Sequence, residues 1–533
     1  MEAAGLGRAG GSWPGARMRA RLLARRTPPV LLALAVAVAL LVLLPLGFLL
    51  DQALSIGWSQ VEALLFRPFV GKLLTNTVAL VAVATTACVV LGVGVAWAVE
   101  RTDLPGRRAW AVLAALPITV PAFVTSYSWV SITPSVQHFG GAAMIVTLAY
   151  YPLVYLPVAA VLRGLDPALE ESARSLGMGP WRTFLRVTLP QTRLALLGGA
   201  LLVAVHLLSE FGAFAMLRFQ TFTTAIYDEY RLSFDGPAAS MLATVLVLLC
   251  LALLLGEIAL RGRARYARVD TGAPRPAARA RLGRARWPVL AALAALVGLA
   301  LGLPLVTLVY WVLHGGSTTF PVVTLLSAAG RSLELGLGAA LLTTLLALPV
   351  SILTIRHTSR IATALERAAY LPYALPGIVV ALSLIVVSVH QFPALYGNTL
   401  LLLIAYSILS LPLALVATRA ALAQAPPVHE EIARSLGCSP LRALVRVTLP
   451  QILPGLGAAA ALVFLATVTE LTATLLLAPI GTQTLATQFW ADASTRAFGA
   501  AAPYAGLMVA ISALPTYMLT RRLGAVVAPR RSA

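Results

Sequence analysis

Long apolar runs alternate with short polar segments along most of the chain. A helix of about 20 apolar residues spans the hydrocarbon core of a bilayer, and its backbone groups are satisfied internally. The pattern therefore predicts an all-α integral membrane protein with about twelve transmembrane helices. The predicted spans are 29–50, 72–98, 109–131, 141–163, 194–217, 237–260, 287–313, 330–355, 369–390, 397–421, 453–476 and 501–520.

One polar segment between these runs occurs twice. Residues 170–191 read EESARSLGMGPWRTFLRVTLPQ, and residues 430–451 read EEIARSLGCSPLRALVRVTLPQ. The offset is 260 residues and no gap is needed, so the chain contains two copies of one module.

Each copy of the repeated segment predicts a pair of short helices. Gly177 and Gly437 follow the first helix, where a positive φ is expected. Pro190 and Pro450 are expected to end the second helix before the next apolar run. Each copy therefore predicts a helical elbow between two membrane spans.

Six predicted spans precede a basic central segment and six follow it, so both halves have the same orientation. The predicted organisation is a cytoplasmic N-terminal tail (1–28), a first six-helix repeat (29–260), a basic cytoplasmic linker (261–286), a second six-helix repeat (287–524) and a cytoplasmic tail (525–533). The linker either contacts anionic lipid headgroups or is a solvated connection that sets the topology.

The charge distribution supports this topology. The chain is 59% hydrophobic and 11% charged, with a net charge of +20. Its arginines cluster between apolar runs, as expected for cytoplasmic loops, so the charge does not predict a nucleic-acid partner. With twelve spans, both termini and both repeated loops are on the cytoplasmic side.

The repeated segment resembles the EAA loop of binding-protein-dependent ABC importer permeases. That loop has a Glu-Ala-Ala start, a glycine four residues later and an aliphatic-x-Leu-Pro ending. The matching positions are Glu171, Ala173, Gly177 and Pro190 in the first copy, and Glu431, Ala433, Gly437 and Pro450 in the second. Ser172 and Ile432 depart from the pattern, because they stand where its first alanine would be. The alternative interpretation is a generic charged cytoplasmic loop.

The resemblance implies a permease in which two modules, usually separate subunits, are fused into one chain of a bacterial cell membrane. It also implies two copies of an ABC ATPase subunit that receive the loops, and an extracytoplasmic solute-binding protein. ATP and Mg would bind to those partner subunits, and no cofactor is expected on this chain. No GxxxxGK[ST] phosphate-binding motif occurs in the sequence. We therefore expect a transport subunit and not an enzyme.

Two carboxylates, Glu210 and Glu470, fall in apolar runs at the same 260-residue offset. Charges in a membrane usually face a polar interior, so both are candidates for the substrate pathway. The alternative is a structural hydrogen bond to a neighbouring helix. His206 lies one turn before Glu210, but Ala466 is at the equivalent place, so a symmetric metal site of histidine and glutamate is not expected.

Two pairs of prolines also repeat. Pro117 and Pro121 align with Pro372 and Pro376 at an offset of 255 residues. They predict broken or kinked helices, which either line the pathway or are plain kinks.

Individual segments of the sequence indicate the substrate. Segments such as YDEYRLSFDG and ELTATLLLAPIGTQTLATQFW look most like ferric-iron permeases. Thiamine, phosphonates, polyamines and sulfate are the alternatives within the same architecture. A secondary transporter is the more remote alternative, since it would have no reason to present two matched elbows.

Overall fold

The structure is a computed structural model that describes residues 28–55, 58–165, 168–261, 279–315, 322–357 and 359–526. Within these ranges it is helical, apart from an isolated bridge between Thr102 and Ala280. The predicted tails, except for residues 28, 525 and 526, and most of the predicted linker lie outside the described residues. The boundaries of the two repeats remain predictions.

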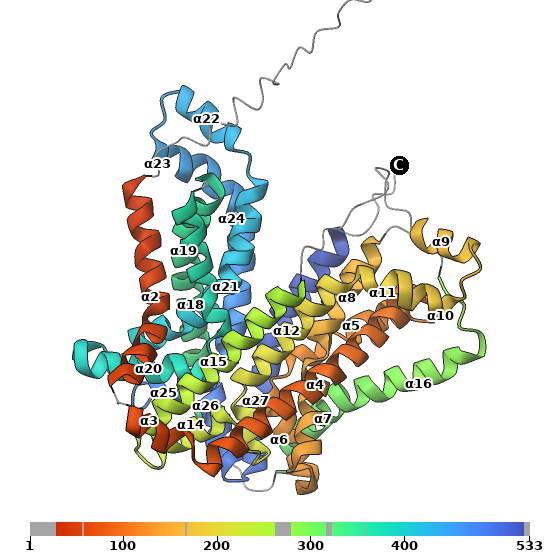
Figure 1. Ribbon diagram of the computed structural model, residues 1–533, viewed down its shortest axis with the longest axis horizontal. Coiled ribbons are helices and arrows are strands. Elements are labelled where there is room, and N and C mark those ends of the chain that lie inside the picture. Colours follow the sequence, from red (N-terminus) through yellow and green to blue (C-terminus); the bar gives the residue numbers. More distant parts are fainter. Residues whose placement is uncertain are drawn as a thin grey trace, which may run out of the picture. The chain divides into compact units, whose positions relative to one another are not determined.

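The helices up to the linker are α2 (Pro29–Ser55), α3 (Trp58–Leu65), α4 (Pro68–Arg101), α5 (Arg107–Leu113), α6 (Ala122–Ile132), α7 (Phe139–Tyr150), α8 (Pro152–Gly164), α9 (Ala168–Ser175), α10 (Pro180–Thr183), α11 (Leu189–Gln191), α12 (Arg193–Ser209), α13 (Gly212–Met216), α14 (Phe222–Arg231) and α15 (Gly236–Arg261) (Figure 1). Those after it are α16 (Arg286–Val297), α17 (Leu303–His314), α18 (Val322–Arg356), α19 (Arg360–Tyr370), α20 (Gly377–Gln391), α21 (Thr399–Gln424), α22 (Pro427–Ser435), α23 (Pro440–Ala443), α24 (Leu449–Val468), α25 (Thr472–Leu477), α26 (Leu485–Ser494) and α27 (Phe498–Val526).

The spans predicted from hydropathy all have counterparts among these helices. In the described part of the chain, eight helices are long and apolar enough to cross a membrane, or up to 11 if each of three bent pairs is one span. The first part of α27, Phe498–Ala513, is also apolar, and α27 matches the last predicted span. The all-α membrane fold is confirmed.

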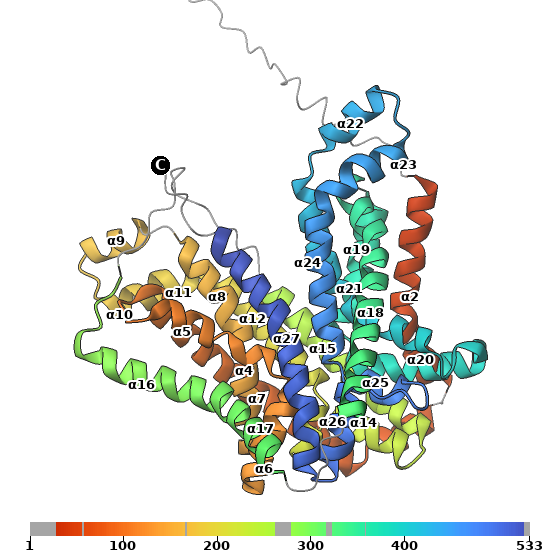
Figure 2. The same ribbon diagram turned by 180° about the vertical axis from the view of Figure 1, so that it is seen from behind.

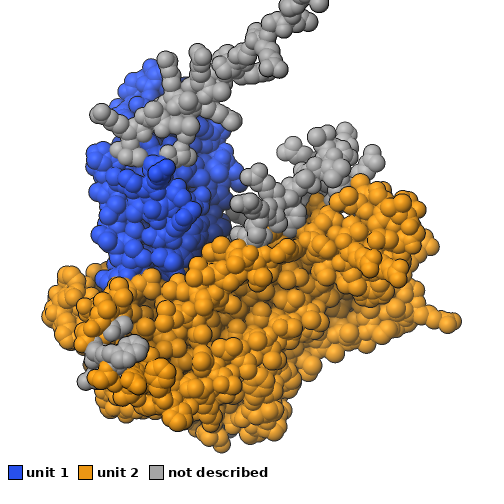
Figure 3. Space-filling model, in the orientation of Figure 1, with its two compact units in different colours: residues 1–44, 340–372, 410–463 blue, residues 45–339, 373–409, 464–533 orange. Residues whose placement is uncertain are grey.

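The chain divides into two compact units (Figure 3). Unit 1 contains residues 1–44, 340–372 and 410–463, and unit 2 contains residues 45–339, 373–409 and 464–533. In unit 1, a small apolar core forms around Leu422, Ile452 and Leu456. Unit 2 has two larger apolar cores.

The centre of unit 2 is a close packing of α4, α8 and α12, which Figure 2 shows from behind. Glycines make this approach possible. A Cβ at Gly92 of α4 would come within 2.8 Å of the Val154 Cβ on α8, and one at Gly199 of α12 within 2.9 Å of the Val154 Cα. Small residues let membrane helices pack backbone to backbone, where apolar burial gives no driving force.

The repeated prolines do break helices, as predicted. A 3₁₀ turn η1 (Leu116–Thr119) precedes Pro121, and the helical segments on its two sides are bent by 90°. A second 3₁₀ turn η6 (Leu371–Ala374) precedes Pro376 and the start of α20.

Helices α4 and α18 are much longer than a membrane span requires. They have 34 and 35 residues. At 1.5 Å per residue each is about 50 Å long, well beyond the roughly 30 Å hydrocarbon core. Each ends in an arginine, Arg101 or Arg356.

Candidate functional site

The first repeated loop is a helical elbow in unit 2 (Figure 1). Helix α9 ends at Ser175 and is followed by Gly177 with φ +83°. The N–H of Met178 donates to the carbonyl of Ala173 at 3.1 Å, and that of Gly177 donates to Arg174 at 3.0 Å. These two bonds form a Schellman motif, so the predicted positive φ is confirmed.

The second repeated loop, in unit 1, has the same local structure. Gly437 has φ +86°, and the N–H of Cys438 donates to the carbonyl of Ala433 at 3.0 Å. Ser439 caps α23, because its Oγ accepts the N–H of Arg442 at 3.3 Å. The repeated sequence therefore gives the same elbow twice.

The two elbow prolines behave differently. A π-helical turn precedes each one, η3 (Phe184–Thr188) or η8 (Leu444–Thr448). Helix α11 ends at Gln191, one residue after Pro190, and a 70° bend separates it from α12, so the predicted end before the apolar run is confirmed in the first copy. The prediction was wrong for the second copy, where α24 continues through Pro450. A π turn already departs from the i→i−4 pattern, so the missing proline N–H need not end the helix.

The positions that match the EAA pattern divide between the interior and the surface. Ala173 and Ala433 are buried, whereas Glu171 is exposed and Glu431 is half-buried. Ile432, which departs from the pattern, is exposed, so its extra bulk does not disturb the packing.

Apolar side chains also lie exposed on both loops. Leu176 is 85% exposed and Leu436 79% exposed, and Trp181 and Leu441 are exposed beside them. These side chains leave apolar surface exposed on otherwise polar elbows.

Sequence reasoning missed a buried ion pair beneath the first loop. Glu170, next to the predicted Glu171, is 6% exposed and its Oε1 lies 3.2 Å from Nη2 of Arg101, the last residue of α4. The same Oε1 accepts a hydrogen bond from Oγ1 of Thr188 at 2.8 Å. Glu170 therefore joins α9, η3 and the end of α4.

The second loop has the same three groups. Glu430 Oε1 accepts hydrogen bonds from Nη2 of Arg356 at 2.9 Å and from Oγ1 of Thr448 at 2.8 Å. Arg356 is the last residue of α18 and also donates to the carbonyl of Ala425 at 3.0 Å. The signal in the sequence was the doubled glutamate in both copies, with a threonine 18 residues later.

The first membrane carboxylate lies at a break in a helix and not inside one. Helix α12 ends at Ser209, Glu210 is extended, and α13 begins at Gly212. The Oε1 of Glu210 accepts the N–H of Ala213 at 2.8 Å, and its Oε2 accepts the hydroxyl of Tyr150 from α7.

Glu470 stands at an equivalent break between α24 and α25. Its Oε1 accepts the N–H of Ala473 at 3.1 Å, and its carbonyl accepts the hydroxyl of Thr474, which also bonds Tyr406. Both carboxylates thus accept a backbone N–H from the second limb of a broken helix. Glu210 also bonds Tyr150 on α7, which is the hydrogen bond to a neighbouring helix expected if its role is structural.

The two breaks lie against each other within unit 2. A Cβ at Gly212 would come within 2.9 Å of Leu471 Cδ2, so residues near the two carboxylates are in close contact. Tyr150 and Tyr406 were not predicted, since a tyrosine in an apolar run gives no distinct signal. The ring of Tyr150 also lies 5.7 Å from that of His206. In the described residues no three His, Cys, Asp or Glu side chains form a metal cluster.

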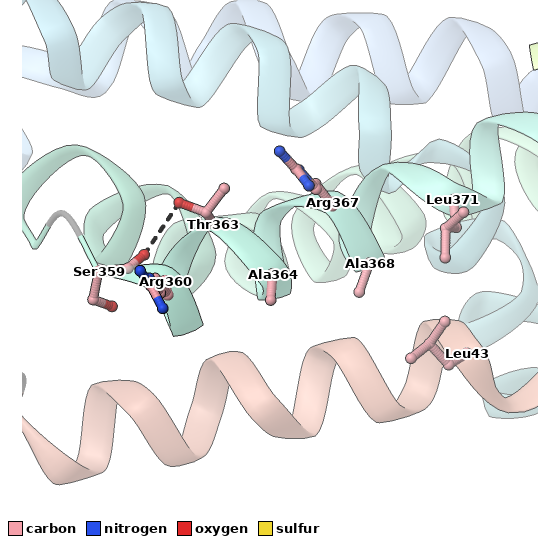
Figure 4. A pocket seen from close by; sticks show the side chains of 8 residues that line it. All are labelled: Leu43, Ser359, Arg360, Thr363, Ala364, Arg367, Ala368 and Leu371. Carbon is pink, nitrogen blue, oxygen red and sulfur yellow. Dashed lines mark hydrogen bonds between the residues drawn. The ribbon is translucent and has the colours of Figure 1, made fainter. Parts of the chain in front are cut away.

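A cavity of about 800 Å³ opens beside α19 in unit 1 (Figure 4). Ala364, Ala368 and Leu371 face Leu43 of α2, and Arg360 stands beside the N-cap Ser359. None of the predicted site residues lines it, so this cavity is separate from the loops and the carboxylates.

Comparison with known proteins identifies the family. The family described as "Binding-protein-dependent transport system inner membrane component" matches residues 88–259 and again 344–533. The chain belongs to this family. Each match includes one elbow and one membrane carboxylate.

Individual relatives agree with two fused modules. The chain is 38% identical over 501 residues to the Fe(3+)-transport system permease protein FbpB 2 of Haemophilus influenzae, covering 93% of this chain and 99% of that protein. It is 30% identical to the sulfate transport system permease protein CysT of Escherichia coli, over 89% of that protein but 42% of this chain. The molybdenum transport system permease protein ModB of Escherichia coli is 30% identical over 60% of its length.

The chain is therefore a multi-pass membrane permease of the ABC importer class. Permeases of this class work with ATPase and binding-protein partners. The predicted resemblance to that class is confirmed.

Proposed function

We propose that this chain is the transmembrane subunit of an ATP-driven importer of ferric iron. The observation that carries the proposal is the similarity to an Fe(3+)-transport permease along 93% of the chain. The oxygen donors at the two helix breaks support it, because ferric iron is a hard ion that favours carboxylate and phenolate oxygen.

Each EAA elbow receives one copy of an ABC ATPase subunit, on which ATP and Mg bind. Glu171 and Glu431 contact basic groups of the ATPase, and Leu176 and Leu436 enter its surface groove. Both termini and both elbows are cytoplasmic, and an extracytoplasmic binding protein delivers the substrate on the other side of the bacterial membrane.

Glu210 and Glu470 form the polar element of the pathway. Each carboxylate oxygen has more than one lone pair, so the bonds to Ala213 and Ala473 leave capacity for a passing cation. Gly212 and Leu471, beside these carboxylates, lie close together in unit 2, so the ionised pair would favour a cation and repel an anion.

A sulfate-type oxyanion is the second candidate, because CysT and ModB are also relatives. The two candidates differ in what the carboxylates do. For an oxyanion, neutral Glu210 and Glu470 would hold the broken helices and contact no substrate.

The test is transport into proteoliposomes that contain the permease, its ATPase and its binding protein, with ferric iron, sulfate and molybdate as substrates. Glu210→Gln and Glu470→Gln should each lower iron transport by roughly tenfold or more, since an interaction with a charged group contributes about 1.5–3 kcal/mol. The double variant should be worse.

Glu334→Gln is the matched control, because Glu334 is exposed and paired with Arg331 on its own helix. Transport of sulfate instead of iron would overturn the substrate assignment. Wild-type iron transport by both single variants would overturn the pathway role of the carboxylates.

A further inference from the structure

The first glutamate of each elbow contacts an arginine and a threonine, in two different settings. In unit 2, the elbow packs through an aromatic group in which the rings of Trp97 and Trp181 stack at 5.6 Å. In unit 1, the surrounding core is aliphatic and includes Leu449 and Ile452. The neighbours differ, yet each glutamate pairs with the last arginine of a long helix and accepts a hydrogen bond from a threonine.

A single oxygen atom makes the connection. Oε1 of Glu170 forms an ion pair with Arg101 and accepts a hydrogen bond from Thr188. Oε1 of Glu430 accepts hydrogen bonds from Arg356 and Thr448. The glutamate lies on the first limb of the elbow and the threonine on the return limb. The bond between them therefore closes the elbow, and the arginine fixes the closed elbow to a long helix.

Burial makes this connection resistant to separation. Arg101 is 6% exposed, and none of its guanidinium nitrogens has a hydrogen bond to another described residue. Its charge is compensated by the ion pair with Glu170, so moving the elbow away would leave a buried cation unpaired. The elbow and the end of α4 must then move together.

Helix α4 carries such a movement into the membrane part of unit 2. It packs against α8 and α12, and α12 ends at the break that contains Glu210. The exposed Glu171 is one residue from the buried Glu170, so adjacent carboxylates serve the surface and the interior.

We propose that Glu170 and Glu430 are positioning residues that transmit movement of each elbow to the long helix ending in Arg101 or Arg356. This rests on the proposed function, in which the ATPase acts on the elbows. The neighbouring Glu171 and Glu431 serve docking, whereas Glu170 and Glu430 serve transmission and touch no partner.

The first test separates docking from transmission. Glu170→Gln and Thr188→Val complexes should co-purify with the ATPase and keep basal ATP hydrolysis. Stimulation by the loaded binding protein should fall at least about fivefold, the lower end of typical coupling between sites. Ser172→Ala is the control, because its exposed hydroxyl bonds only the Ala168 carbonyl.

Reversing both charges of the ion pair provides a rescue experiment. Arg101→Glu should abolish stimulation, and Arg101→Glu combined with Glu170→Arg should restore a substantial part of it. Wild-type stimulation in both Glu170→Gln and Thr188→Val would overturn the proposal. If the unmodified chain bound no ATPase, the proposed function would fail instead, so the two failures are distinguishable.

A second measurement needs no partner protein. Spin labels at Ser175 on the elbow and at the exposed Val90 on α4 report the distance between elbow and helix. In a background without native cysteines, Glu170→Gln should broaden that distance distribution while helix content stays unchanged. An unchanged distribution would overturn the mechanical link, even where the purified complex is too unstable for ATPase assays.

Discussion

The turn at Gly177 allows a sharp test of the elbow as the ATPase-docking element. Gly177 has φ +83°, and a Cβ added there would meet nothing within 4 Å. Gly177→Val therefore introduces no clash, and its penalty is the left-handed backbone alone, roughly 1–2 kcal/mol. A loss of that size lowers the ratio of closed to open elbow by a factor of about 5–30.

The expected result is normal membrane insertion with reduced recovery of the ATPase on purification, and a matching loss of stimulated ATP hydrolysis. Gly177→Asn should be milder, because asparagine tolerates the left-handed region. Gly179→Val is the matched control, since that position has equal space but no positive φ. Full ATPase recovery with normal stimulated activity in Gly177→Val would refute the argument.

Two further predictions concern topology and packing. In a cysteine-free background, Gly177→Cys should resist an impermeant thiol reagent applied to whole cells, whereas Gln391→Cys, at an exposed position, should react with it. Labelling at Gly177 would contradict the cytoplasmic assignment. Gly199→Leu should lower the unfolding temperature, because its Cβ would lie 2.9 Å from Val154 Cα and overpacking costs about 1–3 kcal/mol. Gly198→Leu faces open space and should behave like the unmodified chain; equal effects of the two changes would exclude this packing argument.

The turns of the elbows could be predicted because their determinants are local. A positive φ at Gly177 and Gly437 follows from glycine after a polar helix, and the Ser439 cap follows from serine before a proline. The buried glutamates could not be placed in the same way. Which of two adjacent carboxylates turns inward depends on an arginine about 70 residues earlier in the chain, and no local pattern encodes that distance.

The membrane carboxylates show a different limit. Hydropathy treats residues 194–217 as one continuous span, since leucine and alanine on both sides of Glu210 fit a helix equally well. The structure ends the helix at Ser209 and begins another at Gly212, with Glu210 accepting the N–H of Ala213 in the first turn of the new limb. A carboxylate in this position resolves two problems at once, because the broken helix leaves unpaired backbone donors and the charge needs hydrogen bonds. The structural and the pathway alternatives for these carboxylates are therefore compatible. A helix that breaks inside a membrane needs an acceptor there, and under the proposed function the same carboxylate, when ionised, attracts the passing cation.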